Sequence, residues 1–220
     1  MTINEDRPMP LPFLNFTEVV LMEKFTEEIT ALIETGVPFE EYQYLEGLKE
    51  REIYFNNEVD LNIVNRIVYN IMKWNKEDDE AGIPIEKRKP IKLYITSNGG
   101  CVISGWSVID AIKASRTPVH TIGVAVCASM GALLLMAGHH RKCYKNTTIL
   151  IHDGSLQLAS TSKKAKQTMA FYDELEERIK EFVLENTKIS EELYLQKEDE
   201  EWYMFGDEAL GLGIVDEVIE

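Results

Sequence analysis

Apolar and polar positions follow two different periods along the chain, one typical of strands and one typical of helices. Short apolar runs, rich in β-branched residues, predict buried strands at 51–57, 91–96, 118–128, 141–145 and 147–152. Apolar residues at helical spacing predict helices over 17–35, from Asp60 through Ile71, over 102–114, from Ser129 onward, and over 162–187. The polar stretch 75–90 predicts a loop. Because strands alternate with helices, we expect an α/β fold with crossover connections.

Composition and charge narrow the class of protein further. The 220 residues are 45% hydrophobic and 28% charged, which is ordinary for a globular protein with one good-sized core. A net charge of −15 argues against a nucleic-acid partner, because the phosphate backbone repels an acidic surface. No apolar run is long enough for a membrane span, and the N-terminal residues lack the pattern of a secretory signal. We therefore expect a cytoplasmic protein with no membrane contact.

Cysteine and histidine usage indicates no metal site. The three cysteines, Cys101, Cys127 and Cys143, form no CxxC pair, and an odd count is typical of reduced thiols. The four histidines have no paired spacing to these cysteines. The sequence therefore implies neither a metal nor an organic cofactor.

One hydroxyl stands at the joint between two apolar elements, in the stretch "IGVAVCASMGALLLMAG" (122–138). A serine at such a joint acts as a nucleophile only with a base, an acid that orients the base, and donors for the oxyanion. Ser129 has candidates for all three roles. The candidate donors are the N–H groups of Met130 at the helix start and of Gly99 and Gly100 in "SNGG", and His152 ends a strand 23 residues after Ser129. The stretch 198–201, "EDEE", offers several carboxylates.

Each of these features alone has a structural explanation. A serine at a helix start is usually a cap or a packing residue, "NGG" is usually a turn, and a histidine at a strand end is usually part of the core. The spacing of the residues by itself therefore leaves catalysis and packing equally open.

A longer set of motifs resembles one family. The segments "LYITSNGG", "GWSVIDAIKAS", "VHTIGVAVCASMGALLLMAG", "ILIHDG" and "EALGLGIVDEV", with "LKEREIYFNNEVD" before them, are similar to the proteolytic subunit of the Clp protease, ClpP. The resemblance covers about residues 48–220, which implies a peptidase domain there and an N-terminal extension over 1–47 with one helix. It implies the ββα superhelix shared with crotonases, with a handle formed by a strand and a long helix over 155–187.

The resemblance also implies an activity and an assembly. The chain would be a serine endopeptidase that cleaves unfolded polypeptides inside a barrel of two stacked heptameric rings, fed by a Clp-type ATPase. Ser129 would be the nucleophile and His152 the base, with an oxyanion hole formed by Gly100, with Gly99 beside it, and Met130. Alignment of the closing block places Glu201 at the position of the family's catalytic aspartate, and Asp199 is the second choice.

Three departures from the family pattern keep other hypotheses open. Glutamate replaces the aspartate, Asn98 replaces a proline before the glycines, and the extension is longer than the family's usual N-terminal loop. One alternative is a non-catalytic ring subunit, or a specialised one of the kind found in bacteriophages and in sporulation. A second alternative is a crotonase-like enzyme that acts on acyl-CoA thioesters.

Overall fold

The structure is a computed structural model that describes residues 30, 36, 38–154 and 161–220. The chain divides into two compact units, Met1–Glu46 and Gly47–Glu220, and helix α2 (Phe39–Lys49) contains the boundary between them. The predicted helix over 17–35, and with it the N-terminal helical arm, lies outside the described residues apart from Thr30. The candidate functional residues all lie in the second unit.

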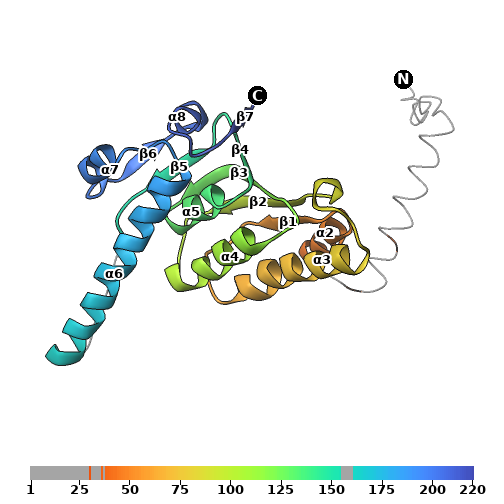
Figure 1. Ribbon diagram of the computed structural model, residues 1–220, viewed down its shortest axis with the longest axis horizontal. Helices are drawn as coiled ribbons and strands as arrows, with labels where there is room; N and C mark the ends of the chain where they lie inside the picture. The colour runs from red at the N-terminus through yellow and green to blue at the C-terminus, as the bar shows by residue number, and fades with distance from the viewer. Residues whose placement is uncertain (1–29, 31–35, 37, 155–160) are drawn as a thin grey trace, which may run out of the picture. The chain divides into compact units, whose positions relative to one another are not determined.

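The described strands of the second unit form one seven-stranded sheet (Figure 1). The strands are β1 (Glu52–Phe55), β2 (Ile91–Ser97), β3 (Val119–Ala128), β4 (His140–Tyr144), β5 (Thr148–Ile151), β6 (Trp202–Met204) and β7 (Glu217–Ile219). Their order is β1-β2-β3-β4-β7, and β5 pairs with the second half of β3 and with β6. All pairs are parallel except β5–β6. The α/β class with a mostly parallel sheet is therefore confirmed.

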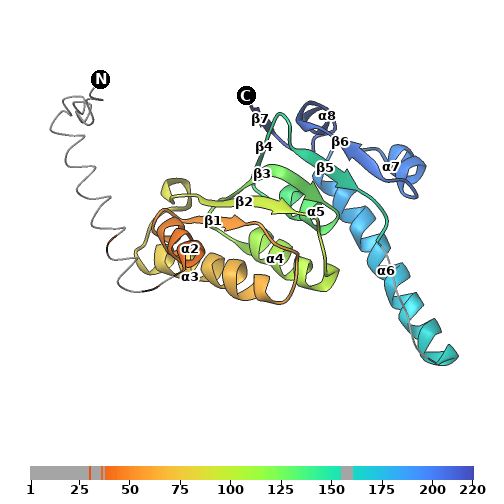
Figure 2. The same cartoon turned by 180° about the vertical axis from the view of Figure 1, so that it is seen from behind.

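Helices connect the strands and bury one face of the sheet. They are η1 (Val64–Val68), α3 (Tyr69–Glu80), η2 (Ile85–Lys87), α4 (Val102–Ala114), α5 (Met130–Met136), α6 (Ser162–Asn186), α7 (Glu191–Lys197) and α8 (Gly206–Gly211). Both ribbon views show α3 and α4 on one side of β1 and β2 (Figures 1 and 2). In β2 the residues Ile91, Leu93 and Ile95 are fully buried and their neighbours are half-buried. This two-residue alternation places the core between that sheet face and the helices.

The predicted loop over 75–90 is wrong for its first part, because α3 continues to Glu80. Trp74 is buried, and the amide of Asn75 donates to Ile71 O at 2.8 Å and to Ser115 Oγ at 2.7 Å. Lys76 pairs with Glu80 one turn further along. These partners come from the tertiary structure and from the helix itself, so a polar composition does not end the helix here.

A buried ionic network joins the segments at the N-terminal end of the sheet. The Asp78 carboxylate is 1% exposed and accepts two hydrogen bonds from the Arg51 guanidinium, at 2.7 and 2.8 Å. Thr117 Oγ1 donates to the same carboxylate at 2.7 Å, and Arg88 Nη2 donates to Asp79 Oδ1 at 2.6 Å. Arg51 precedes β1 and Thr117 precedes β3, so the network fixes where these strands begin.

Strand β3 contains a bulge that divides it into two halves. Ile95 pairs with Gly123 and Ser97 pairs with Cys127, so β3 uses four residues where β2 uses two. Ala125, inside the bulge, has a positive φ of 59°. The irregularity is stabilised by side chains, because the hydroxyls of Thr96 and Thr147 donate to Val124 O and Gly123 O. The first half of β3 pairs with β4 and the second half pairs with β5.

The long helix α6 confirms the helix expected over 162–187. Its C-terminal half packs on the core through Phe182 and Val183, and its N-terminal half extends beyond the sheet (Figures 1 and 2). The expected strand of the handle begins in residues 155–160, which lie outside the described part of the chain.

Candidate active site

Ser129 stands between the end of β3 and the start of α5, in a conformation that L-residues rarely adopt. Its φ and ψ are 53° and −124°. Its N–H donates to Leu150 O at 2.9 Å, and its C=O accepts from the Ala132 N–H at 2.9 Å. The backbone is therefore fixed on both sides, which is how a strained residue is held in place. A strained turn between a strand and a helix is also typical of nucleophilic serines in α/β hydrolases.

His152 and Glu201 meet because of the antiparallel register of β5 and β6. In that register Ile151 pairs with Trp202, so the next pair along the two strands is His152 and Glu201. His152 Nδ1 lies 3.0 Å from Glu201 Oε1. A carboxylate only accepts hydrogen bonds, so Nδ1 carries the proton, and Nε2 of the neutral ring is left as an acceptor.

The parallel register of β3 and β5 brings Ser129 beside the same site. Ala128 pairs with Leu150, so Ser129 and His152 lie at the ends of neighbouring strands. Within the described residues, the Ser129 hydroxyl makes no hydrogen bond to His152. Catalytic hydrogen bonds are often long or poorly aligned in a free enzyme and shorten when substrate binds.

The second-choice carboxylate takes no part in this geometry. Asp199 is exposed and forms no hydrogen bond or ion pair with any residue that the structure describes. The structure therefore brings Glu201, and not Asp199, to the ring of His152. Glu201 is itself 58% exposed at its side chain.

Gly99 and Gly100 allow the loop after β2 to approach the serine closely. A Cβ on Gly99 would lie 2.7 Å from Ser129 Cβ, and one on Gly100 would lie 2.5 Å from Val59 O. Both residues also have positive φ angles, of 100° and 138°. No side chain fits at either position, so the two glycines are required by the contact itself.

The hydrogen bonds of this loop separate the three candidate oxyanion donors. The Gly99 N–H already donates to Ser97 Oγ at 3.1 Å. The flanking groups of Gly100 pair with Val59, through Val59 N–H to Gly99 O and Cys101 N–H to Val59 O. The N–H of Gly100 therefore faces away from Val59. Val59 follows β1 and Ser129 follows β3, and these two strands lie on opposite sides of β2.

Met130 supplies the second free donor, because the first N–H groups of a helix have no partner within the helix. Its N atom lies near the Gly99 backbone, 3.1 Å from where a Cβ on Gly99 would stand. Gly100 and Met130 are thus the two candidates whose N–H groups are not used in the backbone pairing described above.

The residues that support this loop were not predicted from the sequence. Ser97 Oγ donates to Asn57 O at 2.7 Å while it accepts from Gly99, so it fixes the loop to the segment after β1. The strand β6 was also missed. Its buried residues Trp202 and Met204 alternate with an exposed tyrosine, but the alternation spans only three residues.

Charge, burial and neighbouring polar groups shift the pKa values of several side chains near the site. The negative charge of Glu201 raises the pKa of the Tyr203 phenol. Burial raises the pKa of Cys127 to about 12, so that thiol stays protonated. The neighbouring Ser104 lowers the pKa of the exposed Cys101, which follows Gly100. No group of histidine, cysteine and carboxylate side chains suited to a metal ion occurs among the described residues.

Comparison with known proteins decides the family. The protein-family model described as Clp protease matches residues 39–220. The chain belongs to the Clp protease family. One relative, the ATP-dependent Clp protease proteolytic subunit of Deinococcus radiodurans, is 28% identical over 179 residues, which cover 80% of this chain and 84% of the relative. The ATP-dependent Clp protease proteolytic subunit 2 of Bifidobacterium longum is 30% identical over 175 residues, with coverages of 78% and 80%.

Family membership confirms the resemblance and the ClpP-type fold expected from the sequence. It places the chain among peptidases, and it favours that class over the crotonase-like alternative. No helix in the described part of the chain combines the length and the apolar character that a bilayer crossing needs.

Proposed function

We propose that this Clp family member is a serine endopeptidase subunit, in which Ser129 is the nucleophile, His152 the general base and Glu201 the orienting acid. The observation that carries the proposal is the 3.0 Å contact between His152 Nδ1 and Glu201 Oε1, at the end of the strand next to Ser129. An imidazole held in this way by a carboxylate has one ring nitrogen fixed as a donor and the other free to take a proton. The peptidase domain would span residues 48–220, and residues 1–47 would form an extension.

The chemistry is acyl transfer in two steps. His152 Nε2 takes the proton of the Ser129 hydroxyl while Oγ attacks the carbonyl carbon of the scissile peptide bond. The protonated ring then gives this proton to the leaving amine, and an acyl-serine ester remains. A water molecule, deprotonated by the same ring, hydrolyses the ester and regenerates the hydroxyl.

The tetrahedral oxyanion would accept hydrogen bonds from Gly100 N–H and Met130 N–H. The Gly99 N–H is already bound to Ser97 Oγ, so the role of Gly99 is the close approach to Ser129. Fixed backbone donors of this kind stabilise developing charge without reorganisation, and removing one oxyanion donor typically costs ~10²–10³-fold in kcat.

The assembly forms a second part of the proposal. The names of the relatives describe the proteolytic subunit of an ATP-dependent Clp protease. We infer that this chain likewise forms stacked rings around a chamber and receives unfolded polypeptides from a Clp-type ATPase, in the cytosol. The extension of α6 beyond the sheet supports a role in assembly (Figure 1).

Labelling with a fluorophosphonate tests the nucleophile directly. The full chain, checked for folding and assembly, is treated with a fluorophosphonate probe and mapped by peptide mass spectrometry. We expect one adduct, on Ser129. The variant Ser129→Ala should remain unlabelled and should lose cleavage of a short fluorogenic peptide by at least ~10³-fold.

A matched variant separates catalysis from folding. Ser107→Ala removes a hydroxyl that donates to Ser104 O within α4, and this variant should still be labelled at Ser129. If the folded and assembled wild-type chain forms no adduct at Ser129, the peptidase proposal fails. A non-catalytic ring subunit would then explain the family membership.

A further inference from the structure

An exposed thiol stands directly beside the candidate active site. Of the three cysteines, only Cys101 is exposed. It follows Gly100, whose N–H is a candidate oxyanion donor, and its own N–H donates to Val59 O at 2.7 Å. The backbone of Cys101 is therefore fixed by the same pairing that fixes the glycine loop. The peptidase chemistry proposed above gives this thiol no role.

The distance from this thiol to the serine is limited by a short stretch of chain. A Cβ on Gly99 would lie 2.7 Å from Ser129 Cβ. Cys101 is two residues further along, so its Cα is no more than about 12 Å from Ser129 Cβ, given about 3.8 Å between consecutive Cα atoms. Three extended residues span about 10 Å. A group of tripeptide size attached to the thiol is therefore long enough to reach the serine.

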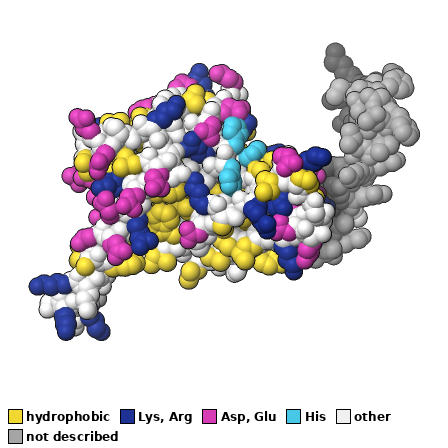
Figure 3. All heavy atoms as spheres, viewed as in Figure 1, with side chains coloured by type: hydrophobic (Ala, Val, Ile, Leu, Met, Phe, Trp, Pro, Cys, Tyr) yellow, Lys and Arg dark blue, Asp and Glu magenta, His cyan; other side chains and the backbone are white. Residues whose placement is uncertain are grey.

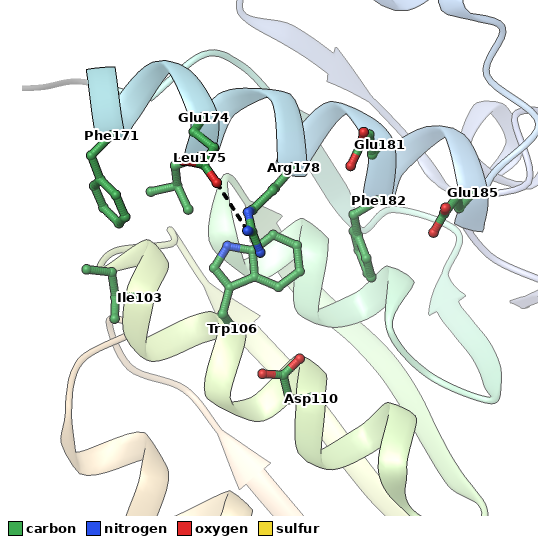
Figure 4. A pocket seen from close by; sticks show the side chains of 10 residues that line it. All are labelled: Ile103, Trp106, Asp110, Phe171, Glu174, Leu175, Arg178, Glu181, Phe182 and Glu185. Carbon is green, nitrogen blue, oxygen red and sulfur yellow. Dashed lines mark hydrogen bonds and ion pairs between the residues drawn. The ribbon is translucent and has the colours of Figure 1, made fainter. Parts of the chain in front are cut away.

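The helix that follows Cys101, α4, packs against the residue that supplies the second oxyanion donor. Gly105 N–H donates to Cys101 O at 3.0 Å, and a Cβ on Gly105 would lie 2.4 Å from Met130 Cγ. Trp106 points from α4 toward α6, where its ring meets that of Phe182 edge-on with 5.5 Å between the centroids (Figure 4). Contacts with α5 and α6 thus hold the first turns of α4, and the thiol has a fixed place.

A buried hydroxyl without a partner lies beside the thiol. The Ser104 side chain is 1% exposed, and its Oγ forms no hydrogen bond with the part of the chain that the structure describes. Such a group is rare in a folded protein and requires an explanation. The side chain of Cys101, at the N-cap of α4, likewise forms no capping hydrogen bond. A neutral thiol is a weak acceptor, whereas a thiolate would accept from this hydroxyl and from the free N–H groups of the first turn.

The pKa of Cys101 agrees with this geometry. The neighbouring Ser104, through its side chain and its N–H, lowers this pKa below its ordinary value of 9.0. The overall charge of the chain acts in the opposite direction, because it is −15 and acidic side chains are spread over the face shown in Figure 3. The stabilisation of the thiolate is therefore local, as is typical of reactive cysteines at helix N-termini.

We propose that Cys101 is a thiol-modification site, at which a low-molecular-weight disulfide caps the chain and blocks access to Ser129. This inference rests on the proposed function, because it concerns the regulation of the same site. The Cys101 thiolate attacks one sulfur of the disulfide and forms a mixed disulfide with it. The S–S bond of the reagent breaks, and its other half leaves as a thiolate that takes up a proton from water.

The exchange is balanced and reversible. Cys101 is oxidised, the released half of the reagent is reduced, and an added thiol runs the same exchange backwards. The other two cysteines serve as internal controls, because both are buried and burial raises the pKa of Cys127 to about 12 and that of Cys143 to about 11. Capping should therefore be confined to Cys101.

Treatment of the full, assembled chain with glutathione disulfide tests the proposal. Peptide mass spectrometry locates the cap, and we expect one glutathione on Cys101 and none on Cys127 or Cys143. Cleavage of a fluorogenic peptide and fluorophosphonate labelling of Ser129 should both fall by at least ~10-fold, because the cap excludes or misplaces the reacting group. Dithiothreitol should restore both.

Three comparisons establish the cause of the inhibition. Cys101→Ser removes the thiol with little change in size, and it should keep its activity in the same treatment. Methyl methanethiosulfonate adds only an S-methyl group to Cys101 of wild type, and this smaller cap should inhibit less than glutathione. Ser104→Ala removes the unpartnered hydroxyl, so the pH profile of the capping rate should move to higher pH.

Several results would overturn the proposal. These are full activity of a chain that is capped at Cys101, equal inhibition of Cys101→Ser, or a cap found only on another residue. Equal inhibition by the two caps would reject blocking by size. If Cys101→Ser fails to fold, the location of the cap in wild type and the dependence of inhibition on cap size decide.

The untreated wild-type chain separates this inference from the peptidase proposal. If Ser129 is labelled before treatment and labelling is unchanged by the cap, only the regulation is rejected. If Ser129 is not labelled before treatment, the peptidase fails and the blocking of its site fails with it. The mass of the cap on Cys101 then still decides whether this residue is a modification site.

Discussion

The two ends of the sheet treat polar groups in opposite ways. At the N-terminal end, Asp78 is almost fully buried, yet two arginine N–H groups and a threonine hydroxyl satisfy its carboxylate. At the other end, Ser129 holds a strained backbone, and its hydroxyl has no partner within the described residues. The first arrangement stabilises the fold. The second leaves hydrogen-bonding groups open for a substrate, and the strain at Ser129 is tolerated because the surrounding backbone is fixed.

The largest expected effect concerns Glu201, the acid at the same end of the sheet as Ser129. Glu201→Gln keeps the size of the side chain but removes the charge that stabilises a protonated His152. We expect kcat/KM for a fluorogenic peptide to fall by ~10³-fold, and the free energy of unfolding to change little because Glu201 is exposed.

Asp199→Asn is the matched control, because it removes a carboxylate two residues away that forms no hydrogen bond or ion pair with the described residues. Its kcat/KM should stay within about twofold of wild type. Equal losses in the two variants would mean that the acidic stretch acts through its overall charge, and Glu201 would lose its assigned role.

The next largest effect concerns the N-terminal end of the sheet, where the Asp78 carboxylate has its hydrogen-bond partners. Asp78→Asn leaves the half-buried Arg51 guanidinium without its counter-charge, and breaking a buried pair in this way costs about 3 kcal/mol of stability. Urea unfolding measures this change, with the exposed Asp173→Asn as control. Labelling of Ser129 in the folded fraction should stay at the wild-type level, because the network and the serine lie at opposite ends of the sheet.

The pH dependence of the stability difference between wild type and Asp78→Asn identifies the cause of that difference. Hydrogen bonds from Arg51 lower the pKa of Asp78 below its ordinary value of 3.8. A lowered pKa in the folded state gives stability that is present above pH 4 and is lost as the pH falls through the folded value. The gap between wild type and Asp78→Asn should therefore narrow on acidification below about pH 4. A gap that stays constant would indicate that the variant acts through packing.

The smallest expected effect is a difference in alkylation rate between the thiol at the Ser129 end of the sheet and the two thiols inside the sheet. Cys101 is exposed with a lowered pKa, whereas burial raises the pKa of Cys127 to about 12 and that of Cys143 to about 11. Thiolate fractions near pH 7.5 then differ by at least ~10²-fold, so iodoacetamide should alkylate Cys101 alone in the native protein. Alkylation of either buried thiol at a similar rate would show that the sheet opens.

The sequence predicted the helices and strands better than it predicted the tertiary contacts between them. Apolar periodicity located β2, β3, α4 and α6, because each buries a regular stripe of side chains. It ended α3 too early, since the partners of Asn75 and Asp78 come from distant segments. It also missed β6, whose three residues are too few for a clear alternation.

The candidate site was likewise predicted only in part: its residues were proposed, but the reason that they meet was not. The roles of Ser129, His152 and Glu201 were proposed from the family resemblance, and the register of β5 and β6 gives a physical reason why residues 49 positions apart meet. That reason was not available from the sequence, because β6 was not recognised. The use of the Gly99 N–H by Ser97 likewise depends on a loop conformation that composition does not determine.

The irregular stretch at 124–126 has a consequence for which changes of length the chain tolerates. Side chains of a strand point to alternate faces, so the loss or gain of one residue there would turn every later position of β3 over, Ser129 included. Only one residue count in this segment places the Ser129 hydroxyl on the side of His152. An insertion or deletion of one residue at 124–126 should therefore disrupt the site even where the strand still forms.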